Sequence, residues 1–126
     1  MADYTPVFTG GAIPKTMQAS ATITGGQILI PTGPGTVGPA GAAAAGAAWV
    51  AAHDAVSGAK VTCWPTKNVT HETVSTGTIA AGDGIQSGAA GVAATVALAT
   101  GAAAGTLLGI AETGATGGAL VRWTGR

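Results

Sequence analysis

The sequence predicts an all-β protein, a small barrel or sandwich of short strands with an internal duplication and an extended N-terminal arm. Short runs rich in β-branched and aromatic residues alternate with turn signals, as at Lys60–Trp64 and Ala119–Thr124. The chain contains 22 glycines and 6 prolines, which interrupt helices. Similar stretches also recur far apart in the chain, which indicates one supersecondary unit used twice.

The recurring stretch begins with AAAG and ends with tryptophan. Residues 43–64 read AAAGAAWVAAHDAVSGAKVTCW, and residues 102–123 read AAAGTLLGIAETGATGGALVRW. This alignment places Trp64 on Trp123, which is 59 positions later (123 minus 64). Ahead of each copy, TITGGQ at 22–27 matches TIAAGD at 78–83. We therefore expect two similar halves, 22–64 and 78–123, with the two tryptophans in equivalent strand positions.

The first 20 residues are expected to form an extended arm ahead of a single β domain that spans 21–126. Pro6, Pro14 and the Gly10-Gly11 pair exclude a helix there. The arm is laid on a neighbouring subunit or completes the domain's own sheet, and the sequence leaves both interpretations open.

Along the rest of the chain, alternation and turn signals predict a series of short strands and one long loop at 32–42. Helices at 40–55 and 89–106 are the main alternative, because alanine has the best helix propensity. Interior glycines count against them, since each costs about 1 kcal/mol in a helix. The strands are expected at 21–24, 27–30, 49–52, 60–64, 69–75, 92–98, 106–111 and 119–124.

Composition argues for an uncharged protein that associates with itself. Charged residues make up 8% of the chain and the formal net charge is zero, so there is little basis for binding nucleic acid by phosphate neutralisation. The apolar fraction is mostly alanine, which gives a thin core, and a small domain with a thin core often needs further burial in an oligomer. The single cysteine excludes an intramolecular disulfide, and no secretion signal is recognisable at the N-terminus.

No motif with catalytic or metal-binding spacing occurs. The candidate residues follow no zinc signature and include no nucleophile elbow, so we expect no enzyme activity, metal or cofactor. The GxGxxG match at 33–38 is followed by a proline and is interpreted as a loop. The GxxxGxxxG match at 101–109 lacks the leucines and isoleucines of a membrane helix. The residues of suitable type are His53, Asp54, Cys63, His71, Glu72 and Asp83.

Three tryptophans keep a second function open. Trp49, Trp64 and Trp123 are expected in the core or at a subunit contact, but a common face of the three rings would suit a β-sandwich carbohydrate-binding or adhesin-like module. A third possibility is a small enzyme domain that uses His53 and Cys63 together with His71.

Several motifs together resemble the head-decoration, or capsid cement, proteins of tailed bacteriophages. The resemblance covers nearly the whole chain, although Gln27 stands where that family usually has an acid and the loop at 32–42 is longer. The motifs that carry it are YTPVF at 4–8, ITGGQILI at 23–30, VAAHDAVSGAKV at 50–61, IAAGD at 79–83 and LGIAETGATGGALVR at 108–122.

The resemblance implies a structural virion protein that binds the outside of the capsid at capsomer junctions and stabilises the shell. It implies the major capsid protein and further copies of this chain, as a homotrimer, as partners, with synthesis in the bacterial cytoplasm and no nucleic acid or membrane partner. The residues expected to contact capsid or a neighbouring subunit are Tyr4, Phe8, Met17, Trp49, Trp64 and Trp123.

Overall fold

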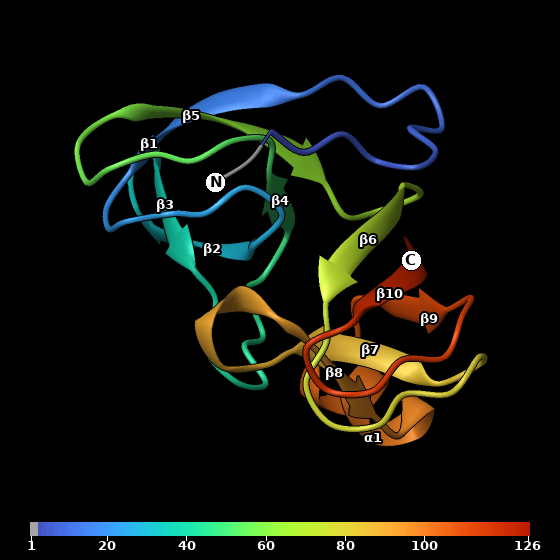
Figure 1. The fold of residues 1–126 in the computed structure, drawn as a ribbon. Coiled ribbons are helices and arrows are strands. Elements are labelled where there is room, and N and C mark those ends of the chain that lie inside the picture. The colour runs from blue at the N-terminus through green and yellow to red at the C-terminus, as the bar shows by residue number, and fades with distance from the viewer. Residues whose placement is uncertain (1–2) are drawn as a thin grey trace.

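The computed structural model describes residues 3–126 and shows two small β assemblies in tandem (Figure 1). Strands from residues 15–65 form one assembly, and strands from residues 70–125 form the other. The predicted all-β class is therefore confirmed.

The first assembly is a closed five-stranded barrel with the strand order β1-β3-β2-β4-β5. β1 pairs with β3 in parallel and with β5 in antiparallel orientation, and these two pairings close the barrel. Its strands are β1 (Lys15–Ala19), β2 (Ile28–Gly33), β3 (Thr36–Pro39), β4 (Trp49–Ala51) and β5 (Lys60–Pro65).

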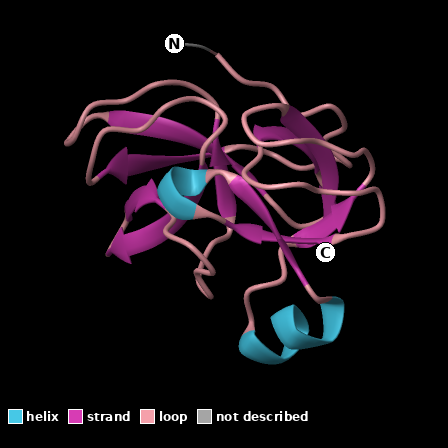
Figure 2. Ribbon diagram, turned by 60° about the horizontal axis from the view of Figure 1, so that its bottom comes forward, coloured by secondary structure: helices cyan, strands magenta, loops and turns pink. Residues whose placement is uncertain are grey.

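The second assembly is a five-stranded sheet with the order β6-β10-β9-β7-β8. A parallel bridge between Ser75 and Ala93 joins the ends of β6 and β8. Two short helices, η1 (Ala89–Gly91) and α1 (Leu98–Ala104), lie in its connections (Figure 2). The strands are β6 (Thr70–Val74), β7 (Gly84–Ser87), β8 (Ala93–Val96), β9 (Gly109–Ala111) and β10 (Leu120–Gly125).

The strand registers of the two assemblies correspond. The pair Pro31↔Val37 between β2 and β3 matches Ser87↔Ala93 between β7 and β8, with an offset of 56 (87 minus 31). From the fourth strand of each half onward the offset becomes 60: Ala51 pairs with Cys63, and Ala111 pairs with Trp123. The four extra residues therefore fall between the third and fourth strands of the second half, where α1 lies.

The expected equivalence of the two tryptophans is wrong by one residue. Trp123 occupies the position of Cys63, whereas Trp64 occupies that of Thr124. A shift of one residue reverses the face of a strand to which a side chain points. Trp123 is accordingly buried and Trp64 only half-buried. The AAAG match produced the misalignment, because it lies in the connection whose length differs between the halves.

The turn at the start of each half uses the same hydrogen bond with different residues. Gly26 and Gly82 have φ values of +89° and +91°, a region that glycine enters without steric cost. The residue after each glycine accepts a hydrogen bond from the backbone three residues earlier: Gln27 Oε1 from Thr24 N–H at 2.7 Å, and Asp83 Oδ2 from Ala80 N–H at 2.9 Å. Gln27 thus performs the structural role of the aspartate.

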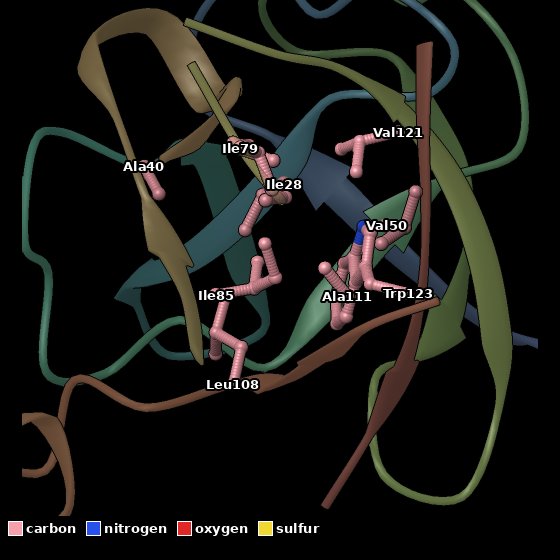
Figure 3. Close-up of a cluster of buried hydrophobic side chains, with 10 residues drawn as sticks. Ile28, Ala40, Val50, Ile79, Ile85, Leu108, Ala111, Val121 and Trp123 are labelled. Atoms are coloured by element: carbon pink, nitrogen blue, oxygen red, sulfur yellow. The ribbon is translucent and has the colours of Figure 1, made fainter. Parts of the chain in front are cut away.

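Two hydrophobic clusters fill the molecule. The interior of the first barrel holds Leu29, Val61 and Cys63 among others. Side chains at the matching positions of the second half form the larger cluster, which also includes Ile28 and Val50 from the first barrel (Figure 3). These two residues alternate with the barrel's inward side chains and pack on the second assembly, so the two halves share one apolar layer.

Three expectations about individual elements need correction. The loop expected at 32–42 contains β3, a strand with few side chains of high β propensity. The helix alternative for 89–106 is right only for the three residues of η1 and for α1, where glycine provides the C-terminal cap: Gly105 has a φ of 74°. The arm expected at 1–20 ends earlier, because β1 takes residues 15–19 into the barrel, where they pair with both β3 and β5.

Candidate functional site

Apart from the sequence neighbours His53 and Asp54, and His71 and Glu72, the candidate catalytic and metal-binding residues lie on different elements of the fold. Among residues 3–126, no group of three or more His, Cys, Asp or Glu side chains is placed to hold a metal ion. Cys63 is fully buried in the first barrel, and this burial raises the pKa of its thiol to about 11. A thiol that stays protonated at neutral pH is a poor nucleophile.

His53 stabilises a turn. Its Nδ1 donates to the carbonyl of Asp54 at 2.8 Å, and its Nε2 accepts from the backbone N–H of Thr62 at 3.1 Å. In the second half, Thr113 Oγ1 accepts from the backbone N–H of Arg122 at 3.0 Å, 60 positions after Thr62. Thr113 therefore accepts the same backbone hydrogen bond in the second half that His53 accepts in the first. The position requires a hydrogen-bond acceptor rather than an imidazole.

His71 lies at the centre of a buried hydrogen-bond relay. Its Nε2 donates to the carbonyl of Pro65 at 2.9 Å, so its Nδ1 accepts from the Tyr4 hydroxyl at 2.7 Å. The Tyr4 oxygen in turn accepts from the backbone N–H of Glu72 at 3.1 Å. Burial lowers the pKa of His71 to about 4 and raises that of Tyr4. The ring of His71 also packs between Tyr4 and Trp123.

Residues 3–8, here called the strap, connect the two halves through Tyr4. The backbone N–H of Tyr4 donates to Ala52 of the first half at 2.7 Å, while its hydroxyl reaches His71 of the second. The strap then continues to Thr70, which exchanges backbone hydrogen bonds with Phe8. The strap therefore belongs to the folded body up to Phe8.

The six residues expected at contacts differ widely in exposure. Trp123 is fully buried, and its Nε1 donates to Thr73 Oγ1 at 3.0 Å, so its ring is not available to a partner. The three tryptophans consequently form no common face for sugar stacking. Phe8 is 63% exposed. The other four are half-buried: Tyr4, Met17, Trp49 and Trp64.

The segment that follows the strap forms a projecting apolar loop. Residues 8–14, here called the tip loop, reach beyond the first barrel before turning back into β1 (Figure 1). The Ala12 N–H donates to the Thr9 carbonyl at 2.9 Å, and this turn displays Phe8 on one side and Ile13, which is 82% exposed, on the other. Large apolar side chains this exposed at a loop tip are candidates for a contact.

A groove of about 610 Å³ lies between the two halves. It is bounded by the strap, the turn around Gly26, the end of β6 and the segment around η1. Val74 and Leu120 are paired across β6 and β10 on its rim and are 45% and 59% exposed. These two residues are not among those that the sequence predicts at a contact. Their alternation with buried residues was visible, but their pairing depends on the register of β6 against β10.

None of the helices in residues 3–126 is long and apolar enough to cross a membrane.

The fold and surface define a small tandem β module with an apolar tip loop and an apolar groove. No family model and no curated protein sequence matches the chain. A solved structure that shares the fold is the N-terminal base of the head fiber protein gp8.5 of bacteriophage phi29. The two align with a TM-score of 0.70 and 20% sequence identity, over 91% of this chain and 94% of that one.

Proposed function

We propose that this chain is a structural protein of a tailed-bacteriophage head, which binds the outer surface of the capsid at capsomer junctions and stabilises the shell. The observation that carries the proposal is the fold shared with the base of a phage head fiber over 91% of this chain. The proposal also draws on the sequence motifs that resemble capsid cement proteins, which are independent of that comparison.

The surface supports a protein partner. With charged residues at 8% of the chain, little charge has to be desolvated when a surface is covered. The exposed Phe8 and Ile13 offer the large apolar side chains that anchor protein contacts. The major capsid protein and further copies of the chain, as a homotrimer, are the partners in this proposal.

A mechanical role is consistent with the structural roles of the cysteine and the two histidines. Cys63 is buried, His53 holds a turn and His71 holds the strap. In this proposal the chain has no catalytic activity and needs no cofactor, and shell stabilisation comes entirely from contacts across capsomer boundaries.

The test is co-sedimentation with purified capsid shells of the phage that encodes the chain. Bound protein should saturate at a fixed number of copies per shell, and decorated shells should release their DNA at a higher temperature than bare shells. Unexpanded shells, whose outer lattice differs, are the matched control. Absence of saturable binding to expanded shells would refute the proposal.

A further inference from the structure

We propose that the tip loop of one copy docks into the groove of a second copy of this chain, which makes the self-association head-to-tail. This inference rests on the proposed function only for the number of copies, three, at which the ring closes. The contact itself is argued from the shape, rigidity and charge of the two surfaces.

The tip loop is built to stay in one conformation. Gly10 and Gly11 have φ values of 58° and 82°, which match the type I′ turn that a Gly-Gly pair favours. Gly10 also packs so closely on the carbonyl of Asn68 that a Cβ there would overlap it. A backbone that is held at Phe8 and at Gly10 before contact lowers the entropy lost when the tip loop binds.

The groove is suited to those two side chains. Its volume of about 610 Å³ lies in the range of about 300–1,000 Å³ that is typical of binding pockets. Val74 and Leu120 provide an apolar rim, and Val92 adds to the lining. Burying the rim together with the tip would remove four of the most exposed large apolar side chains from water.

Charges on the two surfaces are complementary. The exposed Lys15 follows the tip loop directly, and the exposed Lys67 precedes Asn68, on which Gly10 packs. The groove is lined by two carboxylates, Asp3 and Glu72, and within residues 3–126 no cationic side chain lines it. Arg122 is paired with Glu72 at 3.1 Å and offsets its charge, so Asp3 supplies the remaining negative charge of the lining. Complementary potentials favour this pairing over tip against tip or groove against groove.

The tip loop cannot reach the groove of its own chain. The tip loop is bonded to Thr70 at the start of β6, whereas Val74 at its end lines the groove. Four residues of strand separate them by about 13 Å, and the tip loop is fixed by its bonds to β6. A contact between different surfaces of successive copies is heterologous and closes into a ring when the rotation permits.

Disulfide crosslinking tests the contact. Ile13→Cys and Leu120→Cys are made as single variants and as a double variant. The native Cys63 is fully buried and stays out of the reaction. Mild oxidation should crosslink an equimolar mixture of the two single variants, and the double variant should give covalent trimers. Val56→Cys, which replaces a residue 67% exposed elsewhere, is the matched control and should not crosslink with Leu120→Cys.

A second test measures the strength of self-association in a variant without introduced cysteines. Phe8→Ala/Ile13→Ala should weaken self-association by about tenfold or more, with an unchanged melting curve of the dissociated chain. Crosslinking that requires both the Ile13→Cys and the Leu120→Cys substitution supports the contact. Trimers by sedimentation that neither crosslink nor respond to the double alanine variant would overturn it and leave the proposed function intact. Intact crosslinking in a protein that ignores capsid shells would refute the proposed function instead.

Discussion

The Tyr4 hydroxyl donates to His71 Nδ1 at 2.7 Å and thereby fastens the N-terminal strap to the second half of the molecule. The same oxygen accepts from the backbone N–H of Glu72. One side chain near the N-terminus therefore satisfies two buried polar groups on β6, and its loss leaves both without a partner. This relay should govern both the stability of the protein and its dependence on pH.

Tyr4→Phe should destabilise the protein by about 1–3 kcal/mol, because it leaves the Glu72 N–H and His71 Nδ1 unsatisfied while it keeps the ring. The measurement is urea unfolding at pH 7, followed by tryptophan fluorescence. Thr5→Ala, at an exposed neighbouring position, is the control and should stay within about 0.5 kcal/mol of the parent. Equal stability of Tyr4→Phe and the parent would mean that the relay contributes nothing.

Stability should fall as the pH drops from about 6.5 to about 4. The unfolded chain takes up a proton on His71 near pH 6.5, whereas the pKa of His71 is lowered to about 4 in the native protein by burial. Between these values the unfolded state binds more protons, so acid favours unfolding. The stabilisation is complete above pH 6.5, and up to about 3 kcal/mol of it is lost by pH 4.

The variant that tests this pH dependence is His71→Gln, which should flatten the curve of unfolding free energy against pH over this window. His53→Gln changes the other histidine and should retain the loss that His71 causes. A parent curve that is already flat between pH 6.5 and about 4 would contradict the assignment of a neutral, buried His71.

The sequence was sufficient for the β class and the recurring turns because these are local. Gly26 and Gly82 mark the same turn through their backbone conformation, and residue 27 or 83 completes it with a side-chain oxygen. The register of the repeat was not local. Trp64 and Trp123 are 59 residues apart, but the strands superpose at 60, and only strand pairing reveals which residue faces inward.

The residues of the tip loop and the groove likewise divide into those that local sequence identifies and those that only strand pairing reveals. Phe8 could be identified from the sequence as a large side chain on a segment that cannot be helical. The rim pair Val74 and Leu120 could not, because its two members meet only through the pairing of β6 with β10. Short strands such as β3 escaped prediction because barrel closure, rather than propensity, holds Thr36–Pro39 in place.

Gly125→Ala should destabilise the protein by about 1–3 kcal/mol. A Cβ at Gly125 would overlap the backbone carbonyl of Thr66. The loop that carries this carbonyl cannot move away freely, because the N–H of Asn68 donates to the Gly125 carbonyl and the Gly125 N–H donates to the carbonyl of Val69. Gly41→Ala is the matched control, since a Cβ there has no neighbour within 4 Å among the described residues. Thermal unfolding of the two variants should separate them, and equal melting temperatures would show that the loop yields without cost.

Removal of residues 1–20 should unfold the first barrel rather than merely weaken attachment to a partner. β1 lies between β3 and β5, so its loss opens the barrel and leaves two strands with unpaired backbone groups. It also removes Ala19 from the core and the strap from His71. Together these losses should exceed about 5 kcal/mol, which is comparable with the whole stability of a small domain.

Near-ultraviolet circular dichroism should report the loss of fixed aromatic packing, while Phe8→Ala/Ile13→Ala, which changes only exposed side chains of the tip loop, should keep the native spectrum. A truncated protein that melts within a few degrees of the full chain would show that β1 is dispensable and that residues 1–20 act as an independent arm.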